Sequence, residues 1–185
     1  SLEVIPMSEW RRDMFFANTG LPWIMPSPNM PTPDTAMVYP GQVVLEGTNL
    51  SEGRGTTRPF ELFGAPFIQP HRLAAALTAR QIPGVVFREV YFQPTFHKWA
   101  GKICGGLQIH VINPVEYRPL YTTVAVLREI MDLYQHNFAW RPPPYEYEHE
   151  KLPVDIILGS DVVRNMLIAG VSPEEIEDQW LPEQR

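Results

Sequence analysis

The sequence predicts a fold of the mixed α/β class, in which helices and strands alternate in one chain. One long segment has apolar residues at helical spacing, and two shorter segments cluster strand-forming residues. With 185 residues, of which 44% are hydrophobic, the chain is long enough to bury a core without disulfides. Its 20 prolines are about twice the average share and stand in mixed sequence, which predicts rigid, ordered loops.

The beginning of the chain is predicted to contain a strand, a short helix and a proline-rich loop. Residues 2–5 are apolar and predict a short strand. Ser8 is expected to cap a helix that ends at Gly20. Prolines then exclude a regular helix over residues 22–33, because each proline lacks an amide donor and restricts the residue before it.

A second helix is expected to begin at Thr32, because Thr32 can act as N-cap and Pro33 suits the first helical position. Pro40 and Gly41 are expected to interrupt this helix. Residues 43–45 are apolar and are expected to continue its apolar face.

The rest of the chain reads as alternating helices and strands. High helix propensity predicts a helix over residues 71–81. Strand-forming residues predict strands over 85–92 and 107–112, and an apolar stripe predicts an amphipathic helix over 121–134. Three short helical segments are expected at the end of the chain: residues 155–158, a helix capped by Ser160 that runs to Leu167, and a capping box at Ser172 and Glu175.

The loop of residues 46–61 is the main candidate for a functional site. It contains three carboxylates and two arginines: Glu46, Glu52, Glu61, Arg54 and Arg58. Two carboxyl groups that flank a glycosidic bond are the usual catalysts of glycoside hydrolysis, and these glutamates could supply such a pair. The arginines offer planar donors for a carboxylate or phosphate.

A purely structural reading of the same loop is that its glutamates and arginines pair with each other at the surface. Loops of this composition are common, which favours that reading. Three glycines with interleaved opposite charges are nevertheless an entropically costly way to build a mere connector. The functional reading therefore stays open beside the structural one.

Charge and hydropathy exclude several classes of partner. The net charge is −6 and no basic face is visible, so a nucleic-acid partner is not expected. No apolar run approaches the length of a membrane span, so the chain is not expected to cross a membrane. Because it starts at Ser1 without a methionine, we expect the chain to be part of a longer protein. The sequence leaves its oligomeric state open.

Cofactor and metal signatures are missing from the sequence, so neither a cofactor nor a metal site is expected. Gly53 and Gly55 are not followed by the residues of a nucleotide-binding loop. The five histidines have no metal-ligand spacing, and His110, on an expected strand, is more typical of a structural histidine. Cys104 lies in an apolar run and predicts a small buried thiol.

Residues 91–99 are rich in aromatic side chains. Sugar rings stack on aromatic faces, so this segment could form a platform for a glycan. Aromatic core residues at the end of a strand are an equally good reading.

Several motifs of the chain resemble those of the NamZ-type exo-β-N-acetylmuramidases, a bacterial family once catalogued as a domain of unknown function. The most specific is EGTNLSEGRGTT at residues 46–57. Further matching stretches are PSPNMP at 26–31, YPG at 39–41, PFE at 59–61, GAP at 64–66, CGG at 104–106 and QIH at 108–110, with Arg88 and Phe96.

The resemblance implies that the chain is the C-terminal half of such a protein. Residues 1–63 would be the last part of a Rossmann-like catalytic domain with the cleft loop 46–61, and residues 64–185 a smaller auxiliary α+β domain with a mixed sheet. The family removes terminal β-N-acetylmuramic acid from the non-reducing ends of peptidoglycan fragments during cell-wall turnover. It would do so outside the cytoplasm, with muramyl saccharides as its partners.

The resemblance also directs the choice of site residues. Glu46 and Glu52 are expected to be the catalytic carboxylates of this half, with the acid and the base or nucleophile unassigned. Substrate contacts are expected from five further residues: Asn49, Arg54, Arg58, Thr48 and His110. The arginines would hold the lactyl carboxylate that distinguishes muramic acid from N-acetylglucosamine, and Asn49 would bind hydroxyl or acetamido groups. The alternatives are a non-catalytic module that binds cell-wall glycans and a purely structural one.

Overall fold

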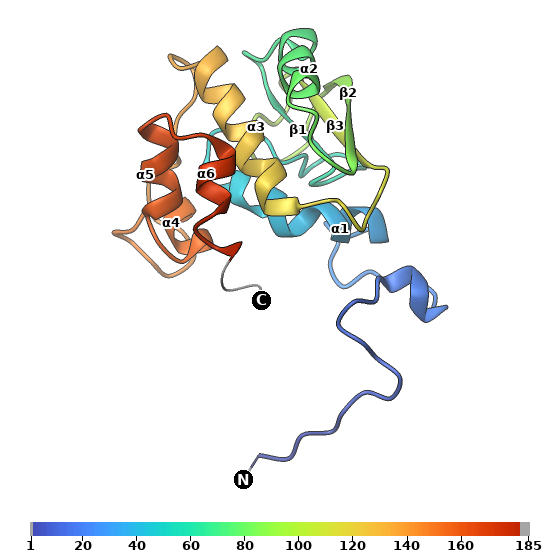
Figure 1. Ribbon diagram of the computed structural model, residues 1–185. Coiled ribbons are helices and arrows are strands. Elements are labelled where there is room, and N and C mark those ends of the chain that lie inside the picture. Colours follow the sequence, from blue (N-terminus) through green and yellow to red (C-terminus); the bar gives the residue numbers. More distant parts are fainter. Residues whose placement is uncertain (1, 182–185) are drawn as a thin grey trace.

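The computed structural model describes residues 2–181 and confirms the mixed α/β class (Figure 1). A small sheet carries helix α2 (Pro70–Ala79), and the long helix α3 (Pro119–Leu133) lies beside both. Helices α4 (Pro153–Leu158), α5 (Val162–Ile168) and α6 (Pro173–Glu177) pack together at the end of the chain. No helix in the described range has the length and apolar content that crossing a membrane requires.

The sheet has three strands in the order β1 (Leu62–Ala65), β3 (Cys104–Val111), β2 (Val85–Phe92). Both ladders are antiparallel, so the mixed sheet expected from the family resemblance is wrong for the described residues. Strand β2 coincides with its prediction, whereas β3 begins earlier than predicted. Sequence analysis missed β1, because four residues with a glycine among them are too short for a periodic signal.

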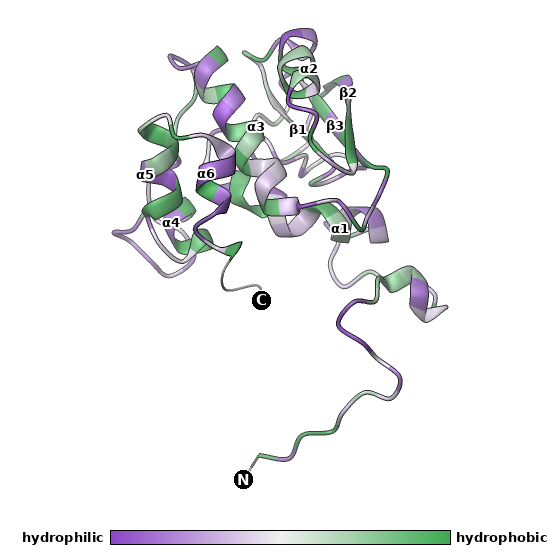
Figure 2. Cartoon of the chain, viewed as in Figure 1, coloured by the Kyte–Doolittle hydropathy of each residue, from purple (hydrophilic) through white to green (hydrophobic). Residues whose placement is uncertain are grey.

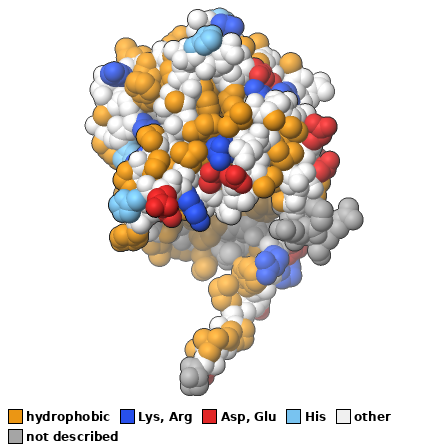
Figure 3. Space-filling model, turned by 90° about the vertical axis from the view of Figure 1, so that its left-hand side faces the viewer, with side chains coloured by type: hydrophobic (Ala, Val, Ile, Leu, Met, Phe, Trp, Pro, Cys, Tyr) orange, Lys and Arg blue, Asp and Glu red, His pale blue; other side chains and the backbone are white. Residues whose placement is uncertain are grey.

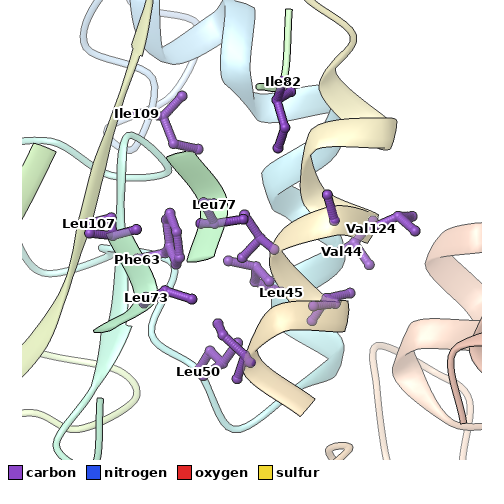
Figure 4. Close-up of a cluster of buried hydrophobic side chains, with 14 of the residues drawn as sticks. Val44, Leu45, Leu50, Phe63, Leu73, Leu77, Ile82, Leu107, Ile109 and Val124 are labelled. Atoms are coloured by element: carbon purple, nitrogen blue, oxygen red, sulfur yellow. The ribbon is translucent and has the colours of Figure 1, made fainter. Parts of the chain in front are cut away.

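One hydrophobic core joins the sheet to α3 and to the segment that precedes the sheet. Phe63 and Leu107 from the sheet and Leu73 from α2 meet Leu45 and Val124 from the opposite side (Figure 4). All five of these side chains are fully buried, so each contributes the full free energy of transfer of its apolar surface from water to the stability of the fold. This core holds the base of the candidate loop in place.

Helix α1 (Pro33–Gln42) begins as predicted, because the hydroxyl of Thr32 accepts a hydrogen bond from the amide of Thr35 at 3.2 Å. The prediction that Pro40 and Gly41 interrupt it is wrong. The helix continues to Gln42, whose amide donates to the hydroxyl of Thr123 on α3 at 2.8 Å. Packing against α3 thus compensates for the backbone hydrogen bond that Pro40 cannot make.

Replacing Gly41 with alanine is expected to lower the free energy of unfolding by about 1–3 kcal/mol, the usual cost of overpacking. An added Cβ would lie 2.1 Å from the carbonyl oxygen of Pro119, so α1 and α3 would have to move apart. Urea denaturation measures the change. Equal or higher stability of the alanine variant, which its better helix propensity alone would give, would contradict the close packing.

Residues 2–32 form an arm that extends from α1 away from the body (Figure 1). The strand expected at residues 2–5 is absent from the described arm, and the expected helix is reduced to a 3₁₀ turn, η1 (Phe16–Thr19), that ends at Gly20. Figure 2 colours several residues of the arm as hydrophobic, and Figure 3 shows hydrophobic side chains along the part that extends from the body. Residues 14–17 line a pocket together with residues of α1. The helix expected between Ser8 and Gly20 would be too short to be stable without packing against the body, which explains why only the 3₁₀ turn forms.

The C-terminal helices follow the predicted pattern with small shifts. Ser172 and Glu175 form the predicted capping box at α6. Helix α5 begins at Val162 after Asp161, so the prediction that Ser160 caps it is wrong. The expected division of the chain at residue 64 stays a prediction; the segment of residues 38–60 shares the core of the sheet.

Candidate active site

The candidate loop begins within a 3₁₀ helix, η2 (Val43–Gly47), and contacts the segment of residues 94–99. The amide and the hydroxyl of Thr95 both donate to the carbonyl oxygen of Gly55, each at 2.9 Å. Gly55 has a φ of +82°, and a Cβ there would lie 2.7 Å from the amide nitrogen of Phe96. Only glycine allows this approach, which brings Lys98 to the loop.

Glu46 lies on η2 and holds two partners. Its Oε1 accepts a hydrogen bond from Arg54 Nη2 at 2.6 Å, and its Oε2 accepts one from the Tyr145 hydroxyl at 2.9 Å. Burial and this hydrogen bond raise the pKa of Tyr145 to about 12, so the hydroxyl stays protonated and donates at neutral pH. The Glu46 side chain is 14% exposed, so it retains access to solvent.

Glu52 lies deeper, with a side chain that is only 1% exposed. Its Oε2 lies 2.7 Å from Lys98 Nζ, and its Oε1 lies 3.4 Å from Arg54 Nε. The same ammonium group donates to the carbonyl oxygens of Leu45 at 2.8 Å and Thr48 at 3.1 Å. Burial lowers the pKa of Lys98 below its usual value, although Glu52 opposes this shift.

Arg54 joins the two glutamates, and its guanidinium carbon lies 4.9 Å from the centre of the Phe60 ring. The structure brings Glu46, Glu52 and Arg54 together through the glutamate–arginine pairing that the structural reading of the loop predicted. Their catalytic and substrate-binding roles stay predictions. We call Glu46, Glu52, Arg54, Lys98 and Tyr145 the carboxylate cluster. Sequence analysis missed Lys98 and Tyr145. The single lysine of the aromatic segment 91–99 could have indicated a partner for a loop glutamate, whereas nothing in the sequence around Tyr145 indicated a contact with Glu46.

Arg58 pairs with the third glutamate of the loop and, within residues 2–181, makes no ion pair with Glu46 or Glu52. Its Nη1 lies 3.4 Å from Oε2 of Glu61, and its side chain is 46% exposed. Glu61 is buried, and its Oε1 accepts a hydrogen bond from the Thr35 hydroxyl at 2.7 Å. This glutamate ties the loop to the start of α1.

Thr48 and Asn49 use their side chains for hydrogen bonds to the protein backbone. The buried Thr48 hydroxyl donates to the carbonyl oxygen of Leu45 at 2.8 Å. The Asn49 amide donates to the carbonyl oxygen of Asn137 at 2.7 Å and accepts from the amide of Ala139 at 3.1 Å. Both residues thus anchor the loop, and their substrate contacts stay predictions.

His110 faces a small cavity of about 100 Å³ that Asp34 and Glu61 also line. Its Nε2 is buried without a hydrogen-bond partner among residues 2–181. The cavity is large enough for water, which can satisfy such an atom. The predicted contact of His110 with substrate stays a prediction.

Two further predictions concern Cys104 and the aromatic segment. Cys104 is the predicted buried thiol, and burial raises its pKa to about 11. Trp99 donates from Nε1 to the carbonyl oxygen of Asn49 at 2.6 Å and packs edge-on against Phe67, which is a structural role. Tyr91, by contrast, is 73% exposed, so its ring is open to solvent, and the predicted glycan platform stays a prediction.

Within residues 2–181, no three His, Cys, Asp or Glu side chains are arranged to hold a metal ion.

Comparisons with known proteins agree with one another. The model of "Exo-beta-N-acetylmuramidase NamZ, C-terminal" matches residues 37–185, and that of "Exo-beta-N-acetylmuramidase NamZ, N-terminal" matches residues 1–34. The peptidoglycan beta-N-acetylmuramidase NamZ of Bacillus subtilis is 41% identical over 97% of this chain. The chain spans only 41% of the length of that relative.

Two crystal structures of DUF1343 family proteins from Bacteroides fragilis have a similar fold. The first has a TM-score of 0.78 and 27% identity and covers 91% of this chain and 44% of its own. The second has a TM-score of 0.59 and 22% identity, covers 86% of this chain and 39% of its own, and supports the fold alone. The two family models meet between residues 34 and 37, close to the start of α1.

Proposed function

The chain belongs to the NamZ exo-β-N-acetylmuramidase family, and from this premise we propose that the whole protein is a glycosidase that releases terminal N-acetylmuramic acid from the non-reducing ends of peptidoglycan fragments. The observation that carries the proposal is the 41% identity to a peptidoglycan beta-N-acetylmuramidase over 97% of this chain. Its place of action would be outside the cytoplasm, where peptidoglycan lies.

The carboxylate cluster supports this chemistry. Hydrolysis breaks the bond between the anomeric carbon and the glycosidic oxygen; water supplies the new hydroxyl on that carbon, and the leaving oxygen takes a proton. A carboxyl group that assists must reach the substrate. Glu46 meets that condition by its partial exposure, and Arg54 and Tyr145 hold its two oxygens in a defined orientation.

Glu52 is better suited to a positioning role. Its side chain is enclosed by Lys98 and Arg54, and a group that is 1% exposed does not meet a substrate without rearrangement. We propose that Glu46 contacts the substrate and that Glu52 acts through Arg54, whose guanidinium it shares with Glu46.

A pair of chromogenic substrates tests the function. We expect the whole protein to release chromophore from an N-acetyl-β-muramide and not from the matching N-acetyl-β-glucosaminide. Release from the glucosaminide at an equal rate would contradict the proposed specificity. Binding of the muramide without any release would favour a module that only binds cell-wall glycans.

A further inference from the structure

A groove with a volume of about 590 Å³ opens on the face of the sheet that points away from the core. Leu62 on β1 and Arg88 on β2 both lie opposite Gln108 on the central strand β3. Directly paired residues of neighbouring strands point to the same face, so these three side chains form a row across the sheet. Arg58, from the candidate loop, also lines the groove.

Arg88 is held in place without being neutralised. Its Nη2 donates a hydrogen bond to Oε1 of Gln108, a buried side chain, which orients the guanidinium group. Within residues 2–181, no carboxylate lies within 4.0 Å of Arg88. Arg58 uses Nη1 for Glu61, at 3.4 Å, and its half-exposed side chain keeps further donors. Two guanidinium groups therefore face one groove.

The remaining lining suits a sugar acid. Glu89 also lines the groove. It lies opposite Leu107, whose side chain is in the core, so the alternation of the strand directs the Glu89 side chain to the face opposite that of Arg88. Val90 and Phe92 lie on the strand β2 near Arg88, are only partly buried and offer apolar surface to a sugar ring. A groove of this size matches the usual range for small-ligand sites. In a chain of net charge −6, this local excess of positive charge favours an anionic ligand.

We propose that this groove binds the lactyl carboxylate of N-acetylmuramic acid, with Arg88 as the main contact and Arg58 as the second. The inference rests on the proposed function and deepens it, because this carboxylate is what N-acetylglucosamine lacks. Arg54, the other arginine predicted for this role, already lies between Glu46 and Glu52. Arg88 is thus a specificity-determining residue, outside the carboxylate cluster.

The first test compares two substrates of the whole protein: a chromogenic N-acetyl-β-muramide and the same compound with its lactyl carboxylate converted to an amide. Arg88→Gln should lower kcat/KM for the acid by about 10- to 100-fold, the effect of losing hydrogen bonds to a charged group. For the amide, the loss should be clearly smaller, since the ion pair is absent in both proteins and only a hydrogen bond to the amide carbonyl oxygen remains to be lost. Arg58→Gln should have a smaller effect in the same direction.

Arg72→Gln is the matched control, because Arg72 is an exposed arginine on α2 outside the groove. It should leave both substrates unaffected. Equal losses on the acid and the amide with Arg88→Gln would show a structural role and overturn the inference. Unchanged preference for the acid would place the carboxylate elsewhere and overturn it as well.

The second test is independent of turnover. Calorimetric titration of the whole protein with free N-acetylmuramic acid and with N-acetylglucosamine should show tighter binding of the acid, and Arg88→Gln should remove this difference. If that holds while neither chromogenic substrate is cleaved, the proposed function fails and the inference stands. If the muramide is cleaved but the titrations show no preference that depends on Arg88, the inference fails and the function stands.

Discussion

Replacing Glu46 with glutamine is expected to reduce kcat of the whole protein on a chromogenic N-acetyl-β-muramide by about 10²- to 10⁴-fold, the usual contribution of a general acid or base. Glutamine keeps the size of the side chain, and its amide oxygen can still accept a hydrogen bond from Arg54 or Tyr145. What it loses is the capacity to exchange a proton or carry a negative charge. Steady-state kinetics with active-site concentration held equal measures the loss.

Two comparison variants separate catalysis from structure. Glu116→Gln changes an exposed glutamate outside the carboxylate cluster and should leave kcat unchanged. Glu52→Gln should lower both kcat and the melting temperature, because it weakens the buried contacts to Lys98 and Arg54. Full activity of Glu46→Gln would show that Glu46 is not a catalytic residue. If Glu52→Gln lowers kcat but leaves the melting temperature unchanged, Glu52 contacts the substrate directly and is not a positioning residue.

The long elements of this fold could be predicted because their signals are local. The apolar stripe of α3 and the strand-forming residues of β2 need no knowledge of distant contacts. Signals failed where tertiary packing decides the outcome. Helix α1 runs through Pro40 because α3 receives it, and β1 exists because β3 offers it a partner.

The candidate site shows the same division. Composition and family resemblance pointed to the loop of residues 46–61, and the structure places three of its charged residues in one cluster. Which charged residues form ion pairs depends on how deeply each side chain is buried and on which distant segments of the chain the fold brings together. Lys98 is 46 positions from Glu52 along the chain, and Arg88 reaches the groove only through the register of β2 against β3. Spacing along a sequence carries neither kind of information.

The buried pair of Glu52 and Lys98 should make the candidate loop sensitive to the loss of either partner. Removing both charges from water is costly, and burial lowers the pKa of Lys98 even with Glu52 beside it. The pair is therefore a weak source of net stability while it is intact. Removing one partner should be strongly destabilising, because the remaining charge would stay buried without its partner and without hydration.

Replacing Lys98 with methionine is expected to lower the free energy of unfolding by about 3–5 kcal/mol, because Glu52 would keep only Arg54, at 3.4 Å, as a partner. The double variant Lys98→Met with Glu52→Leu should recover about 2 kcal/mol or more of that loss, since it removes the stranded charge. Lys151→Met, at an exposed lysine, is the control and should change little. Urea denaturation of the four proteins gives the comparison. If the double variant is as unstable as Lys98→Met alone, the ammonium acts mainly through the carbonyl oxygens of Leu45 and Thr48, and the loop is held by those hydrogen bonds and not by the ion pair.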